Sequence, residues 1–178
     1  MSDSASDTED PMPSEGDSEH RGGVAPWCLA TVVADKALAA LLESGGTPRF
    51  KDDAPWLLAK TEFERAAAAN LRVPLLLLED PGLAWRYWCL IDSIDVLELS
   101  GKRFASEVTM TALREITPLF RELDSVLLRP DGLQIAREAR EGVRMLRHPV
   151  TEAYVRPYAF CETPGFIPGL TAWQVPQD

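Results

Sequence analysis

The chain has 178 residues, a formal net charge of −10 and 46% hydrophobic residues, which allows one domain with a substantial core. Residues 1–25 hold seven acids and one base, so of the 28 acids and 18 bases in the whole chain, 21 and 17 remain for the body. A body this close to neutrality lacks the basic face that duplex nucleic acid usually requires.

The three cysteines, Cys28, Cys89 and Cys161, are widely spaced and form no C-x-x-C or Cys/His cluster. This spacing argues against a disulfide framework and a structural zinc site, and it predicts three reduced, buried thiols. No early apolar segment follows a basic start, and no stretch approaches eighteen apolar residues. We therefore expect a cytoplasmic protein with no membrane segment, no metal and no cofactor.

Residues 1–24 are rich in Ser, Asp, Glu, Gly and Pro and almost free of large apolar side chains. Such a segment cannot bury enough surface to offset chain entropy, so it is predicted to be a disordered acidic tail. It would serve to keep the protein soluble or to attract a basic partner surface. Residues 25–178 are predicted to form a single domain.

The first half of that domain is predicted to alternate helices and strands. Pro26 suits a first helical turn, and apolar residues at helical spacing predict a helix over 27–44 that ends at Ser44-Gly45-Gly46. A loop over 47–54 leads to a strand at 56–60. Thr61 and Glu64 have capping-box spacing, which predicts a helix over 62–71.

The second half is predicted to be mainly strands. The fully apolar run 73–78, with Pro74 first, reads as a central strand. Segments 85–91 and 94–99 are followed by Ser100-Gly101 and by 103–110, which predicts a hairpin. Further elements are a strand near 125–128, a helix over 133–147 and a strand over 154–160. The predicted fold is α+β: a mixed, mostly antiparallel sheet or small β-barrel with about three peripheral helices.

Sequence motifs for catalysis are scarce. The chain has no glycine-rich phosphate loop, no G-x-S-x-G elbow and no H-E-x-x-H pattern. His148 beside Pro149 suits a helix terminus better than a general base, and the apolar flanks of Cys89 suit a core thiol better than a nucleophile. The sequence therefore favours a protein that is not an enzyme.

Aromatic residues supply the main candidate for a ligand site. Trp85 and Tyr87 share one face of a predicted strand by period two, and Arg156 and Tyr158 share one face of another. Were these faces to meet, the rings and the guanidinium would form a pocket for a planar base or a cation. The alternative is that the rings pack the core. Lys60 and Glu62, at the end of a predicted strand, are either further site residues or ordinary surface charges.

The segment Trp56-Leu57-Leu58-Ala59-Lys60-Thr61-Glu62 gives a W-L-x-x-K-x-E pattern followed by a predicted helix and strands. Over residues 55–115 the chain resembles the PUA-like superfamily, especially its EVE and ASCH branches. The resemblance implies a small β-barrel that recognises modified bases or RNA through an aromatic-lined pocket, without a cofactor. Trp56, Lys60 and Glu62 are the positions that it carries over.

Two classes of function remain open. The first is a non-catalytic binding module with an aromatic-lined pocket for a modified base or another nucleic-acid-like ligand. The second is an acidic protein-interaction module, such as an inhibitor, immunity or adaptor protein, which would bind a basic protein partner and no small molecule.

Overall fold

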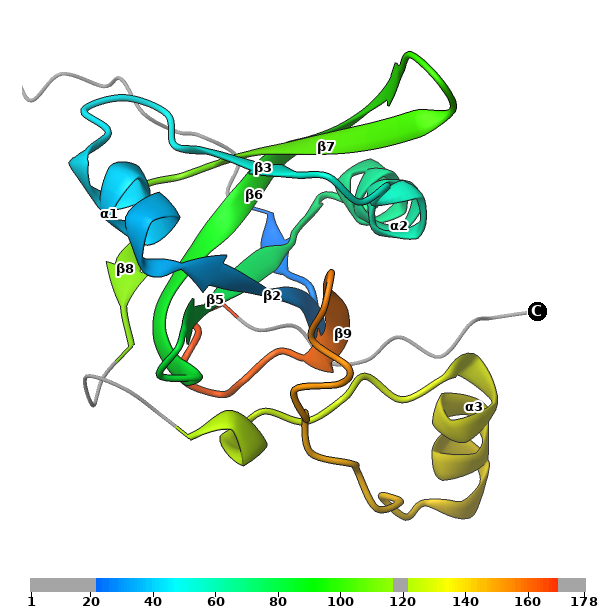
Figure 1. Ribbon diagram of the computed structural model, residues 1–178. Coiled ribbons are helices and arrows are strands. Elements are labelled where there is room, and N and C mark those ends of the chain that lie inside the picture. Colours follow the sequence, from blue (N-terminus) through cyan, green and yellow to red (C-terminus); the bar gives the residue numbers. More distant parts are fainter. Residues whose placement is uncertain (1–21, 117–121, 170–178) are drawn as a thin grey trace, which may run out of the picture.

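A computed structural model describes residues 22–116 and 122–169 (Figure 1). Within these residues the fold is α+β, with three α-helices, one short 3₁₀-helix and nine strands. In chain order the elements are β1 (Gly23–Val24), β2 (Trp27–Ala34), α1 (Asp35–Glu43), β3 (Arg49–Asp52), α2 (Leu57–Ala68), β4 (Leu71–Arg72), β5 (Pro74–Asp80), β6 (Ala84–Leu99), β7 (Arg103–Met110), β8 (Arg114–Glu115), η1 (Leu123–Ser125), α3 (Gly132–Glu141) and β9 (Ala159–Glu162).

The main sheet is mixed and mostly antiparallel, with strand order β3-β7-β6-β5-β2-β9. Among the described strands of this sheet only β2 and β5 are parallel to each other; β8 pairs with β6, and β1 and β4 form a separate parallel pair. The long strand β6 pairs with β5 through its first half and with β7 through its second half. The two end strands of the main sheet are β3 and β9. The described residues therefore form an open sheet and not the closed small barrel that the sequence left as an option.

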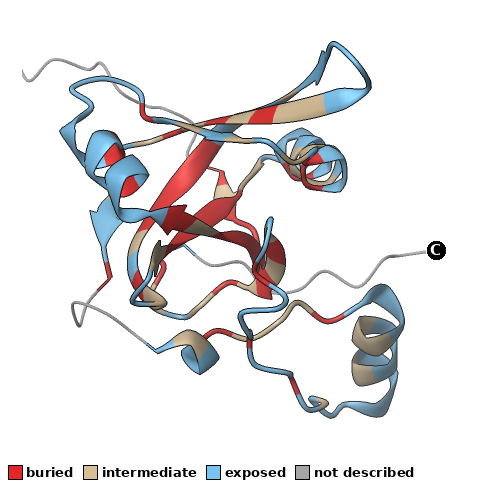
Figure 2. Cartoon of the chain, in the orientation of Figure 1, coloured by how far each residue is buried: buried red, intermediate tan, exposed pale blue. Residues whose placement is uncertain are grey.

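The sheet is covered on both faces. One cluster of buried side chains joins the sheet to α1 and α2 through residues such as Leu38, Trp56 and Ala66. The second cluster, on the other face, includes Leu76, Trp85 and side chains from the irregular segments after β8. Figure 2 shows this distribution, with buried residues concentrated in the central strands and α3 largely exposed. The sheet therefore forms the middle layer of the body.

The predicted helix over 27–44 is wrong in its first half, because Trp27–Ala34 form strand β2. This segment is buried on both faces, and a run of this length that is apolar except for Thr31 has the same appearance as a buried helix in sequence. Only Asp35–Glu43 are helical, and Leu38 and Leu41 supply the buried stripe of that helix.

The predicted strand at 56–60 is also wrong, since α2 already begins at Leu57. Ala59 and Ala66 face the core, whereas Leu57 and Leu58 are exposed. Thr61 does not cap the helix, because its hydroxyl lies one turn inside it and donates to the carbonyl oxygen of Leu57 at 3.0 Å. A Ser or Thr within a helix commonly bonds to the carbonyl four residues earlier, and this happens here.

Several predicted elements are confirmed. β5 begins at Pro74 and lies inside the sheet, and β7 covers the expected residues 103–110. The expected hairpin forms between β6 and β7, and Gly101 has a φ of 78° in its turn, where glycine pays no steric cost. The two predicted strands at 85–91 and 94–99 are one continuous strand, β6.

The boundaries of the remaining predictions need correction. The helix over 133–147 ends at Glu141, because Gly142 adopts the left-handed conformation that terminates helices. The final strand is Ala159–Glu162 and not 154–160, and the strand near 125–128 is reduced to isolated bridges at Leu127 and Leu128. The predicted tail over 1–24 extends too far, since Gly23–Val24 form β1 and Val24 is buried; residues 1–21 lie outside the described residues.

Candidate functional site

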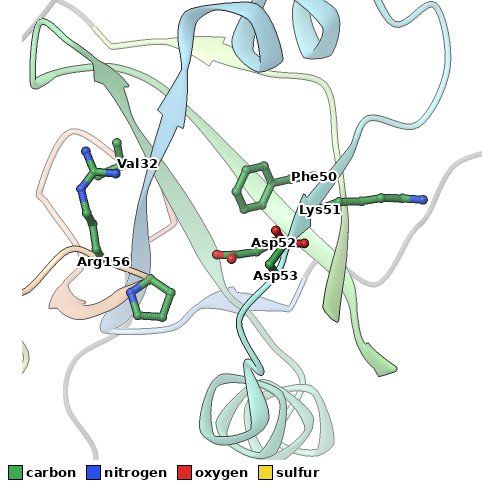
Figure 3. Close-up of a pocket in the computed structure, with 7 residues that line it drawn as sticks. Val32, Phe50, Lys51, Asp52, Asp53 and Arg156 are labelled. Atoms are coloured by element: carbon green, nitrogen blue, oxygen red, sulfur yellow. The ribbon is translucent and has the colours of Figure 1, made fainter. Parts of the chain in front are cut away.

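A cleft of about 550 Å³ lies between β2, β3 and the segment before β9. Figure 3 shows Val32 and Arg156 on one side and Phe50, Asp52 and Asp53 on the other, with the ring of Phe50 directed into the space between them. Two further residues, Lys51 and Pro157, complete the lining. Because Asp53, Lys51 and Arg156 are exposed, the cleft is open to solvent.

The β3 side of the cleft is held in place by Trp56, which is fully buried. The Phe50 and Trp56 rings lie 6.0 Å apart, and the Trp56 backbone N–H donates to Ser106 Oγ at 2.9 Å. The indole Nε1–H donates to one carboxylate oxygen of Asp52 at 3.0 Å, and the backbone N–H of Ala54 donates to the other at 2.9 Å. Asp52 therefore shapes the loop, and its oxygens are already engaged.

The charges that remain available to a ligand lie on opposite sides. Arg156 pairs with Asp80 at 3.0 Å, which leaves half of its side chain exposed. Asp53 has no hydrogen bond or ion pair within the described residues. The cleft thus offers guanidinium donors on one wall, and a carboxylate acceptor together with an aromatic ring on the other.

The structure does not assemble the pocket predicted from Trp85, Tyr87, Arg156 and Tyr158. Trp85 is fully buried in the second core cluster, and its Nε1–H donates to the carbonyl oxygen of Leu123 at 3.1 Å. Tyr87 packs against the first cluster, on the other face of the sheet. A β-bulge separates them: Tyr87 lies opposite Leu77 and Trp85 opposite the adjacent Leu78, so the period-two rule fails between them.

Arg156 and Tyr158 also diverge. Arg156 lines the cleft, whereas Tyr158 packs its ring 4.7 Å from Trp56 and 5.8 Å from Phe160. Arg156 is thus the one residue of the predicted pocket that lines the cleft. The ligand-binding role of the others stays a prediction, and their placement is that of packing residues.

Lys60 and Glu62 lie in α2 and not at the end of a strand. Lys60 pairs with Glu64 at 2.6 Å and donates to the carbonyl oxygen of Ile94 at 3.2 Å. Glu62 pairs with Arg65 and with Arg129, the latter at 3.0 Å, and the Arg129 guanidinium lies over the rings of Trp27 and Phe160. The bonds to Ile94 and Arg129 connect α2 to the rest of the fold, whereas the pairs with Glu64 and Arg65 lie within the helix.

Sequence reasoning misses Phe50, Asp52 and Asp53, because it predicts a loop over 47–54. The alternation in Arg49-Phe50-Lys51-Asp52 is the period-two pattern of a short half-buried strand, and it could have revealed β3.

The cysteines are confirmed as free and buried among the described residues. Burial raises the pKa of the Cys89 thiol far above its ordinary value, as expected for a packing residue.

Within the described residues, no group of three or more His, Cys, Asp or Glu side chains is placed to hold a metal ion. In the same part of the chain, no helix combines the length and apolar character needed to cross a membrane. No protein family, curated protein or solved structure matches the chain.

Proposed function

We propose that this protein is a non-catalytic binding module of the cytoplasm, and that the cleft between β2 and β3 holds a flat, base-like ligand. The observation that carries the proposal is that the Phe50 ring is directed into the cleft from the wall that also carries the unengaged carboxylate of Asp53, opposite the wall that carries Arg156. The cleft volume of about 550 Å³ lies in the range of small-molecule sites.

Each of these groups suits one part of a nucleobase. A base stacked on an aromatic ring gains roughly 1–3 kcal/mol, whatever its identity, because every base has a π face. The guanidinium donates to ring nitrogens and carbonyl oxygens, and the carboxylate accepts from an exocyclic amino group. A base stacked on Phe50 would have the Arg156 donors across the cleft and the Asp53 acceptor on the wall to which Phe50 belongs.

The residues in the cleft favour binding over catalysis. The described residues that line it include no His, Cys, Ser or Thr, so its unengaged carboxylate, Asp53, has no imidazole, thiol or hydroxyl in the lining with which to form a catalytic set. Both oxygens of Asp52 accept hydrogen bonds from the protein, so this carboxylate is occupied as a structural acceptor. The resemblance to the PUA-like superfamily implies the same class of ligand, and the pattern that carries it, Trp56 to Glu62, directly follows the cleft residues of β3.

The proposal is tested by titrating four methylated bases, namely 1-methyluracil, 1-methylcytosine, 9-methyladenine and 9-methylguanine, at millimolar concentration. Binding is followed by amide chemical shifts in ¹⁵N-labelled protein. Phe50→Leu keeps an apolar side chain but removes the ring, and it should weaken binding of the best base by roughly fivefold or more, as expected for about 1–3 kcal/mol of stacking.

Phe104→Leu is the matched control, because Phe104 lies in β7 and does not line the cleft. It should leave binding unchanged. Equal binding by Phe50→Leu and the wild type would contradict the site. Failure of all four bases to bind would contradict the ligand class and would favour the protein-interaction module.

A further inference from the structure

The main chain of β2 faces the cleft at Val32. β2 pairs with β9 from Trp27 to Ala30, and the backbone N–H of Thr163 donates to the carbonyl oxygen of Pro26. In an antiparallel pair, every second residue directs both its N–H and its C=O to the neighbouring strand. Counting from Pro26, the residues directed toward the β9 side are Cys28, Ala30 and Val32.

Pro157 prevents the ladder from continuing to Val32. By the same register Pro157 would lie opposite Val32, but proline has no N–H to donate to the Val32 carbonyl. The Pro157 carbonyl oxygen instead accepts a hydrogen bond from Thr31 Oγ1 at 2.7 Å. Within the described residues the N–H and C=O of Val32 have no partner on this side, and Val32 lines the cleft.

The opposite wall has the same character at Lys51. The backbone N–H of Met110 donates to the carbonyl oxygen of Pro48, so Phe50 and Asp52 direct their main chain toward β7. Lys51 lies between them and directs its N–H and C=O away from β7, at the edge of the sheet that borders the cleft. Two open strand edges therefore bound the cleft.

This inference rests on the proposed function: we infer that main-chain groups form hydrogen bonds with the edge of the ligand, and that those of Val32 are the principal ones. An outward-facing residue of an extended strand presents an N–H donor beside a C=O acceptor. Its complement is a ring edge with an acceptor beside a donor, such as the cis-amide of uracil or guanine or the amidine of cytosine or adenine. Pro157 is the positioning residue that keeps this edge open.

The open edge makes a distinctive prediction about proline. Proline is tolerated in a strand only where its nitrogen faces an open edge. Val32→Pro should therefore fold, with a melting temperature within a few degrees of the wild type, while it removes one donor from the cleft. Val33→Pro is the matched control: the Val33 main chain faces β5, so this variant should lose cooperative unfolding.

Measurements of base binding test the hydrogen bonds of the Val32 main chain separately from the stability of the fold. The tightest of the four methylated bases is compared with its analogue methylated at the donor nitrogen of the same edge, as 1-methyluracil is with 1,3-dimethyluracil. The wild type should prefer the unblocked base by roughly tenfold, about one hydrogen bond. Val32→Pro should bind the unblocked base roughly tenfold more weakly, whereas Val32→Ala, which shortens a lining side chain but keeps the N–H, should retain the wild-type preference for the unblocked base.

Four results would overturn the inference. Val32→Pro failing to fold like Val33→Pro would show that the Val32 N–H is engaged. Unchanged binding by a folded Val32→Pro, or equal binding of blocked and unblocked bases, would reject main-chain reading while base binding itself stood. If no base binds the wild type, the proposed function and this inference fall together.

Discussion

Replacing Trp85 separates a core role from a ligand-binding role for the most prominent aromatic residue of the predicted pocket. Its side chain is fully buried, packs in the second core cluster, and donates to the carbonyl oxygen of Leu123. Trp85→Ala should lower the free energy of unfolding by about 3–5 kcal/mol, as for other large aromatic residues truncated in cores. This figure includes roughly 1 kcal/mol for the lost hydrogen bond.

The measurement is urea unfolding followed by fluorescence and circular dichroism. Tyr154→Ala is the control, since Tyr154 is 58% exposed and its loss should change stability by no more than about 0.5 kcal/mol. Trp85→Ala should bind bases like the wild type in its folded fraction, because Trp85 does not line the cleft. A loss of less than about 1 kcal/mol, well below the cost of emptying a packed site, would refute the core assignment.

Three further predictions concern the periphery and the thiols. A chain beginning at residue 25 should be less stable than one beginning at residue 22 by about 1.5–3 kcal/mol, the value of a buried valine, and equal urea midpoints would argue against β1. The hydrogen bond from Arg147 holds the pKa of Glu138 at about 2 against an ordinary 4.5, so its contribution to stability is complete above pH 4.5 and is lost as the pH falls toward 2. Glu138→Gln should therefore melt lower than the wild type at neutral pH, by a difference that shrinks over that window; a difference independent of pH would contradict the assignment. Thiol reagents at pH 8 should label the native protein slowly, and they should label the unfolded protein at all three cysteines: Cys28, Cys89 and Cys161. Rapid labelling of the native protein would place a thiol at the surface.

Local patterns were sufficient wherever a segment is governed by its own residues. The turn chemistry of Ser100-Gly101 and the alternation that follows it predicted the bounds of β7, and the uninterrupted apolar run after Pro74 predicted the buried strand β5. The α+β class followed from the mixture of such patterns. These predictions succeeded because the turn and the burial of β5 each determine which residue types occur in the segment itself.

Burial without periodicity was ambiguous. The segment from Trp27 to Ala34 is covered on both faces of the sheet, so nearly all of its residues are apolar and it shows neither the helical nor the strand period. At Leu57 and Leu58 a strand is predicted where the structure has a helix, because the two exposed leucines at the start of α2 resemble part of an apolar strand. Which neighbours a segment packs against decides these cases, and those neighbours are distant in sequence.

By itself, then, the sequence determined the class of fold, the hairpin of β6 and β7, and the burial of β5 and of the thiols. Tertiary structure alone decided the candidate site, because that site depends on relations between strands. The bulge in β6 sends Trp85 and Tyr87 to opposite faces, and Pro157 ends the β9 ladder beside Val32. The curl of the sheet then brings the open edge of β3, with Phe50, across from that position. Pairing register is a property of two chain segments together, so it has no counterpart in the local pattern of either one.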